Sequence, residues 1–191
     1  DTLIDESDAH VTIVDRQGRP GGHWNDAYSF VRLHQPSSFY GVNSMALGSG
    51  RKDDSGLNAG FHELASGPEI SSYFDRVMQH KLLPSGRVAW FPMSAVLGTA
   101  LGAPGGPGDR EFESLISGRR TRVRVRRKVV DASYMGPSVP STHTPRFSVA
   151  PGVRLLPPNA LPSLWQPRLA GPTPRRFVIL GAGKTAMDAA I

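Results

Sequence analysis

One stretch of the chain shows a clear helical period of apolar positions. From Pro68 to Leu83, apolar side chains recur at three- and four-residue spacing, which predicts an amphipathic helix with one face in the core. Pro68 suits the first turn of this helix because its missing N–H would have no partner there. The residues from Pro84 to Gly86 are expected to end the helix.

Short apolar or alternating runs predict the strands. The β-branched run Val11–Val14 is expected to be a buried strand, and Arg87–Phe91 and Phe177–Leu180 are two further short strands. The stretch Phe112–Ala132 predicts an antiparallel hairpin that turns at Gly118. Strands and helix together indicate an α/β protein.

The second arm of this hairpin carries a high density of basic residues. Seven of the ten residues from Arg119 to Lys128 are basic, and Val123 and Val125 alternate with arginines in the period of a sheet with one solvated face. A row of arginines could neutralise the phosphates of a nucleic acid. Because no aromatic residue interleaves with them for base stacking, an exposed hairpin face is favoured over a nucleic-acid-binding module.

The residues between 25 and 44 follow neither the helical nor the strand period. They mix aromatic, imidazole, amide and hydroxyl side chains, a composition more typical of a site than of a spacer. A second interpretation is a small satellite core beneath a long loop, formed by the aromatic residues Tyr28, Phe30, Phe39 and Tyr40.

Composition excludes several classes of protein. The 191 residues contain no cysteine, which excludes a disulfide framework, a thiolate metal site and a redox cysteine pair, and with them the flavin disulfide reductases. No apolar run of about 18 residues and no signal segment occurs, so we expect a cytoplasmic protein without membrane contact. The net charge of +6 suits an anionic partner, but it does not separate a nucleic acid from a nucleotide cofactor.

A glycine turn follows the last predicted strand. Gly181 and Gly183, with Ala186 at the third position, lie between Phe177–Leu180 and a run of good helix formers. A dinucleotide pyrophosphate requires strand, glycine turn and helix in this order, because Gly183 permits close approach and the helix start presents free N–H groups. A plain turn is the alternative, since glycine-rich turns after strands are common.

A second candidate lies at the end of the first strand. Asp15 closes this strand and could accept hydrogen bonds from a ribose, as acidic residues do at the end of the second strand of dinucleotide folds. Alternatively, Asp15 only starts a turn, which aspartate often does. His23 and His34 are candidate proton-transfer groups because imidazole titrates near neutral pH, although a loop histidine is more often a hydrogen-bond donor.

Four segments together resemble the flavin-containing and Baeyer-Villiger type monooxygenases, and more closely the bacterial FAD/NAD(P)-binding oxidoreductases of that two-domain architecture. These segments are Val11–Trp24 (VTIVDRQGRPGGHW), Arg32–Ser44 (RLHQPSSFYGVNS), Val129–Phe147 (VVDASYMGPSVPSTHTPRF) and Phe177–Ala190 (FVILGAGKTAMDAA). An acidic strand end, a Gly-Gly-x-Trp element and a glycine fingerprint follow one another in the order that is typical of this family. The resemblance spans nearly the whole chain, as a middle section of the family's sequence.

The resemblance implies two cofactors, FAD and NADP, with NAD as the alternative to NADP. It implies that FAD is held by residues after the first strand and in the following loop: Asp15, Arg16, Gly21, Gly22, Trp24, His34, Gln35, Pro36 and Ser37. It implies that the NADPH pyrophosphate is held by the later turn: Gly181, Gly183, Lys184, Thr185 and Ala186. Asp188 matches an acidic position of the family's second helix and is expected to be structural.

The resemblance also implies a Rossmann-like, three-layer FAD/NAD(P)-binding fold with an inserted antiparallel hairpin. Residues 1–172 would form part of the FAD-binding domain, and residues 173–191 would begin the NAD(P)-binding domain. Because the chain opens on Asp1 and ends inside the last predicted helix, we expect a fragment truncated at both ends. The family's first glycine fingerprint, which holds the FAD pyrophosphate, would precede Asp1, so we expect this chain to bind FAD weakly or not at all by itself.

The expected function is an FAD-dependent, monooxygenase-like oxidation in which NAD(P)H reduces the flavin and a small molecule is the substrate. Two alternatives stand beside it. One is a basic nucleic-acid-binding module that uses Arg119–Lys128, and the other is a truncated product without function.

Overall fold

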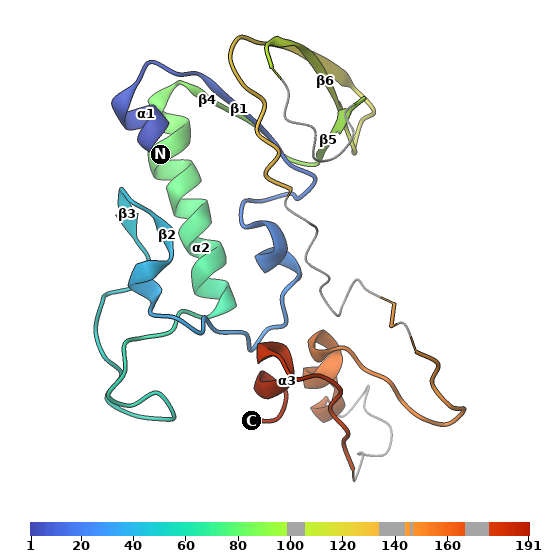
Figure 1. Cartoon of the computed structure of the whole chain (residues 1–191). Helices are drawn as coiled ribbons and strands as arrows, with labels where there is room; N and C mark the ends of the chain where they lie inside the picture. The colour runs from blue at the N-terminus through green and yellow to red at the C-terminus, as the bar shows by residue number, and fades with distance from the viewer. Residues whose placement is uncertain (99–105, 134–143, 146, 167–175) are drawn as a thin grey trace. The chain divides into compact units, whose positions relative to one another are not determined.

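The fold is mixed α/β with small sheets, as the computed structural model shows for residues 1–98, 106–133, 144–145, 147–166 and 176–191 (Figure 1). Its α-helices and strands follow in this order: α1 (Thr2–Glu6), β1 (Val11–Val14), β2 (Gly41–Val42), β3 (Met45–Ala46), α2 (Gly67–Val77), β4 (Val88–Phe91), β5 (Ser94–Leu97), β6 (Gly108–Ser114), β7 (Arg120–Val125) and α3 (Lys184–Asp188). Short 3₁₀ helices cover Gly22–Asp26, Ser37–Phe39 and Pro158–Trp165. The predicted α/β class is therefore confirmed.

The chain divides into two compact units. The first comprises Asp1–Asn25, Val42–Met45 and Tyr73–Pro137, and the second comprises Asp26–Gly41, Ala46–Ser72 and Ser138–Ile191. The predicted domain boundary after residue 172 falls on a stretch outside the described residues. That boundary stays a prediction.

A parallel strand pair, β1 and β4, lies in the first unit (Figure 1). Val11 is opposite Val88 and Val14 is opposite Phe91, which confirms both predicted strands. Parallel strands are joined by a crossover rather than by a tight turn, and the segment between β1 and β4 contains α2. The carboxyl ends of β1 and β4 meet at one edge, where open α/β folds bind ligands.

The predicted antiparallel hairpin is confirmed and is formed by β6 and β7. Gly118 has a φ of 68° at its turn, a conformation that favours glycine. Its first arm begins at Gly108 rather than at Phe112, and its second arm ends at Val125 rather than at Ala132. A third strand, β5, pairs with β6. It was not predicted from the sequence, because Ser94–Leu97 begins with two small residues and has only Val96 and Leu97 as large apolar positions.

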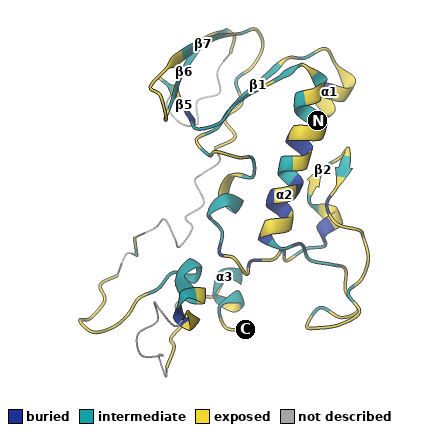
Figure 2. Ribbon diagram, turned by 180° about the vertical axis from the view of Figure 1, so that it is seen from behind, coloured by how far each residue is buried: buried dark blue, intermediate teal, exposed yellow. Residues whose placement is uncertain are grey.

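The predicted amphipathic helix is confirmed as α2. The helical path continues past Val77 through a π turn and a 3₁₀ turn to Ser85, and Gly86 ends it with a φ of 67°. Ile70 and Tyr73 are fully buried, and buried and exposed residues alternate along the helix (Figure 2). Ser66 and Glu69 form a capping box at its start, with Glu69 Oε2 accepting from Ser66 N at 2.7 Å.

These hydrogen bonds lower the pKa of the Glu69 carboxyl, with the Ser66 hydroxyl as the first cause and the Ser66 amide as the second. Both groups donate to the ionised carboxylate, and donors to a carboxylate favour its charged form. The start of α2 is therefore held most firmly when Glu69 is ionised.

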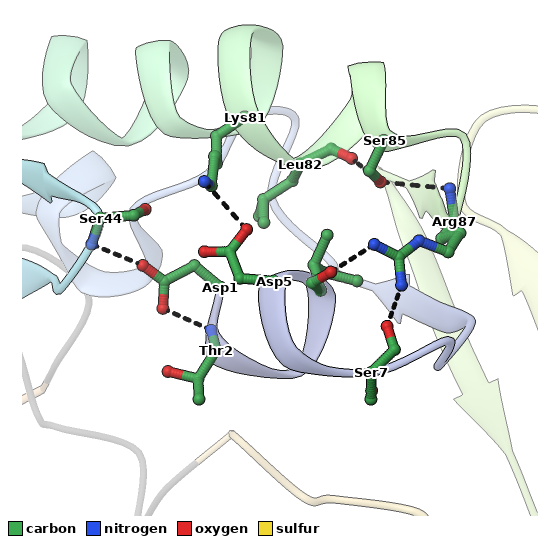
Figure 3. A network of polar contacts seen from close by, with 10 residues as sticks. Asp1, Thr2, Asp5, Ser7, Ser44, Lys81, Leu82, Ser85 and Arg87 are labelled. Atoms are coloured by element: carbon green, nitrogen blue, oxygen red, sulfur yellow. Dashed lines mark hydrogen bonds and ion pairs between the residues drawn. The ribbon is translucent and has the colours of Figure 1, made fainter.

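A polar network fixes α1 against the end of this helical path (Figure 3). The Arg87 guanidinium donates to the backbone oxygens of Ile4 and Ser7, which are free carbonyls at the end of α1. Lys81 pairs with Asp5 at 2.9 Å, and Asp1 accepts from Ser44 N at 2.8 Å. The polar N-terminal segment is therefore ordered by side-chain contacts as well as by the burial of Ile4.

The prediction of a strand at Phe177–Leu180 is wrong, because the structure forms no strand there. These four residues belong to no strand and pair with none of the described ones, and the exposed fraction of Val178 is 85%. An isolated β-strand has no partner for its backbone N–H and C=O groups, so an apolar run alone does not form one.

Candidate functional site

The turn after β1 holds Asp15 through both backbone groups. Its N–H donates to Phe91 O at 3.1 Å and its carbonyl accepts from Ser94 N at 2.8 Å. Its carboxylate Oδ1 accepts from Gln17 N at 2.9 Å. Asp15 therefore starts a turn, as the simpler interpretation expected, and it does so at the carboxyl end of a parallel strand. Its contact with a ribose stays a prediction.

Met93 lies beside this turn in a strained conformation. Its φ is 47°, in the left-handed region that is unfavourable for residues other than glycine. Its N–H donates to Gln17 O at 3.0 Å and its carbonyl accepts from Leu115 N at 2.7 Å. The residue thus joins the turn after β1 to the end of β6, and these two bonds hold it in the strained form.

Gly21 and Gly22 follow on the same loop, with φ of 121° and 53°. Their loop is closed by Arg19 and Asn25, because Arg19 Nε donates to Asn25 Oδ1 at 2.8 Å and Asn25 Nδ2 donates to Arg19 O at 3.2 Å. A Cβ at Gly22 would meet nothing within 4 Å, so space lies open beside the backbone there.

Two other predicted site residues lie on or beside the same loop. Arg16 is exposed just after Asp15. Trp24 is half-buried, its N–H donates to Gly21 O at 3.1 Å, and its ring lies next to His23 with 5.2 Å between centroids. The structure therefore places Asp15, Arg16, Gly21, Gly22 and Trp24 on one continuous segment of the first unit, a loop that ends in the 3₁₀ helix Gly22–Asp26.

The next group of predicted site residues, His34 to Ser37, belongs to the second unit. Ser37 is 1% exposed, its Oγ donates to Glu63 O at 2.9 Å, and it accepts from Ala65 N at 2.8 Å. These bonds give Ser37 a structural role as the anchor of its loop. His34 is exposed, and Gln35 and Pro36 are half-buried; their contact with a flavin stays a prediction.

The later glycine turn leads into a helix, as the fingerprint expected. Gly181 has a φ of 146°, and Gly183 caps α3 by accepting from Ala186 N at 3.0 Å. A Cβ at Gly181 would lie 3.2 Å from the Cβ of Ala186, so small residues at both positions let the turn lie against the helix. A Cβ at Gly183 would meet nothing within 4 Å.

Tyr28, Lys184 and Asp188 form a cluster that was not predicted from the sequence. It joins α3 to the loop that contains Tyr28. Tyr28 Oη donates to Asp188 Oδ2 at 2.6 Å, and the Lys184 ammonium donates to the same oxygen. Burial, followed by the hydrogen bond and the charge of Asp188, raises the pKa of Tyr28 to about 12. A hydrogen bond with Thr185 opposes this rise.

Part of this cluster had a signal in the sequence. Lys184 and Asp188 are four residues apart, the spacing at which opposite charges meet on a helix. Tyr28 had none, because its partner lies 160 residues away in the chain. The satellite-core interpretation holds for Tyr28 itself, which is 7% exposed and lies 4.7 Å from the ring of Phe30, whereas Phe39 is 77% exposed.

Acidic residues lie opposite the arginines of the hairpin. Arg122 pairs with Glu111 at 2.6 Å, and Arg120 pairs with Glu113 at 2.9 Å. Each carboxylate raises the pKa of its arginine, first through the hydrogen bond and then through its charge. The basic arm thus faces a partly neutralising strand, in agreement with an exposed hairpin face.

The described parts of the chain hold neither a cluster placed to bind a metal ion nor a helix able to span a membrane. There, no group of three or more histidine, aspartate or glutamate side chains is placed to hold a metal ion. Over the same residues, no helix has the length and the apolar character that crossing a bilayer requires.

Known proteins resemble this chain at the level of sequence. An uncharacterized protein of Mycobacterium tuberculosis is 50% identical over 188 residues, which are 98% of this chain and 32% of the relative. An uncharacterized protein of Mycobacterium bovis matches with the same figures. The chain therefore spans about a third of the length of the curated relatives it matches. No family model and no solved structure matches.

Proposed function

We propose that the chain is part of an FAD-dependent oxidoreductase in which NADPH or NADH reduces the flavin. The observation that carries this proposal is the turn from Asp15 to Gly22 at the carboxyl end of the parallel pair β1 and β4. Ligands of α/β folds bind at this end of parallel strands, and an acidic residue there suits a ribose. The Rossmann-like three-layer architecture is part of the same proposal.

The chain's own residues would then bind and orient the two cofactors. Asp15 would accept hydrogen bonds from the adenosine ribose, with its orientation fixed by Gln17 N. The open backbone at Gly22 would let FAD lie along it, and the open backbone at Gly183 would let the NADPH pyrophosphate approach without meeting a side chain. When bound, the nicotinamide supplies a hydride and the flavin accepts it. The substrate would be a small molecule.

The whole-protein claim is tested on the full-length Mycobacterium tuberculosis relative. After incubation with FAD and desalting, we expect flavin absorbance to stay with the protein, and NADPH to bleach it when oxygen is excluded. Protein that retains no flavin and oxidises no NADPH would refute the proposed function.

The residue claim is tested on this chain by titration with FAD up to millimolar concentrations, because binding by the isolated chain is expected to be weak at most. Asp15→Asn is expected to weaken binding about tenfold, because a neutral amide oxygen accepts a hydrogen bond from a ribose hydroxyl less strongly than a carboxylate does, and tenfold corresponds to about 1.4 kcal/mol. Asp8→Asn, an exposed aspartate just before β1, is the matched control and should leave the affinity unchanged. Equal affinities for both variants would remove Asp15 from the site.

The competing nucleic-acid function is weakened by the two ion pairs of the hairpin. Replacing Arg122, Arg124 and Arg126 by serine would abolish salt-sensitive retention on DNA or RNA if this face bound phosphates. We expect the wild-type chain to show little such retention and the triple variant to behave like it.

A further inference from the structure

The cluster of Tyr28, Lys184 and Asp188 carries an inference that rests on the proposed function. We propose that Tyr28 is a positioning residue that governs how readily Lys184 is recruited by a phosphate group at the Gly181–Gly183 turn. It acts by fixing the Asp188 carboxylate that holds the lysine ammonium.

The geometry supplies the first step. Asp188 Oδ2 accepts from Tyr28 Oη at 2.6 Å and from Lys184 Nζ, so one oxygen serves two donors. The Lys184 and Asp188 side chains are 32% and 21% exposed, which leaves the pair within reach of a ligand. Both donors and the acceptor belong to the second unit.

The second step concerns what happens when the ammonium leaves. A half-buried carboxylate that loses its cation is destabilised unless another donor remains. The Tyr28 hydroxyl stays in place because its ring is 7% exposed and packs against Phe30. Tyr28 therefore lowers the cost of moving Lys184 from Asp188 to a phosphate.

Two variants then have opposite effects. Tyr28→Phe removes only the hydroxyl, so Asp188 depends on Lys184 alone and the lysine is harder to recruit. Asp188→Asn removes the carboxylate, so the lysine is released. If the cluster served stability alone, both variants would change the affinity for NADPH in the same direction.

The first measurement needs no nucleotide. The chain has four lysines, Lys52, Lys81, Lys128 and Lys184, and their acylation rates can be followed by mass spectrometry of the folded chain. Relative to the other three, Lys184 should react about threefold faster in Asp188→Asn and about threefold slower in Tyr28→Phe, since an amine held against the Asp188 carboxylate is less accessible to the reagent. Lys81, paired with Asp5, is an internal comparison.

The second measurement is the affinity for NADPH. We expect Tyr28→Phe to weaken binding about threefold and Asp188→Asn to strengthen it about threefold, with the double variant equal to Asp188→Asn because Tyr28 acts only through the carboxylate. Tyr40→Phe, in the same unit, is the matched control and should change neither readout.

The outcomes separate the two proposals. If Lys184 labelling changes as described but wild type does not bind NADPH, the proposed function and the recruitment by phosphate fail, while the control of the Lys184–Asp188 pair by Tyr28 stands. If Lys184 labelling is unchanged in Tyr28→Phe, the positioning role is overturned, even where Asp188→Asn does not fold. Weaker NADPH binding in both single variants would also overturn it.

Discussion

Two apolar runs of four residues, each followed by glycines, behave differently in this protein. Val11–Val14 pairs in parallel with Val88–Phe91, and its last residue leads into a turn whose backbone is hydrogen-bonded on both sides. Phe177–Leu180 also precedes a glycine turn, but it belongs to no strand, and its side chains are between 43% and 85% exposed. The second turn keeps its shape through α3 rather than through a sheet.

The difference teaches that the glycine turn and the strand before it are separable. The turn at Gly181 is set locally, by a positive φ and by the contact with Ala186. A strand is set by a partner elsewhere in the chain. The relatives are about three times as long as the stretch they share with this chain, so they have further residues with which such a run could pair.

The largest expected effect comes from shortening the same side chain in both runs. Ile13→Ala should lower the free energy of unfolding by about 2 kcal/mol, because Ile13 is half-buried in a paired strand. Ile179→Ala should change it by less than about 0.5 kcal/mol, because Ile179 is 43% exposed and unpaired. Chemical denaturation measures both. Equal losses would mean that both runs are buried alike in solution.

A smaller effect is expected from adding a methyl group to the turns. Gly21→Ala should destabilise the chain by about 1–2 kcal/mol, because its φ of 121° is unfavourable for alanine. Gly181→Ala should cost less than about 1 kcal/mol despite its φ of 146°, since the unpaired run before it can adjust.

Gly18→Ala is the control for this pair. A Cβ there would lie 3.6 Å from Met93 Sδ, an ordinary contact, and its backbone conformation is not restricted to glycine. We expect a change within about 0.5 kcal/mol in the same denaturation experiment. A larger cost for Gly181→Ala than for Gly21→Ala would show that the later turn is the more rigid one.

The smallest effect concerns pH. Burial and Asp188 raise the pKa of Tyr28 to about 12 in the folded chain, whereas an unfolded tyrosine titrates near pH ~10. The unfolded chain therefore loses this proton first, and the stabilisation from Tyr28 is complete below that pH and declines as the pH rises toward 12. Denaturation at several alkaline pH values should show a steeper decline in wild type than in Tyr28→Phe, and the difference between the two profiles is the contribution of Tyr28. Identical pH profiles would contradict it.

The sequence predicted those elements whose signal is local. The helix α2 follows from its apolar period and the hairpin from its alternation and Gly118. The strand predicted for Phe177–Leu180 was wrong because strand pairing depends on residues outside the run. For the candidate site, the loop from Asp15 to Gly22 and the turn before α3 were found by pattern. The Tyr28–Asp188 bond was not, since only the folded chain brings these residues together.

The pairing of β1 with β4 also bears on how the chain folds. Val11 meets Val88, and α2 lies in the long segment between them. Closing such a long loop loses entropy before any contact is gained, so pairing of this kind is slow. We therefore expect α2 and the hairpin to form early, and the edge that presents Asp15 to be completed late in folding.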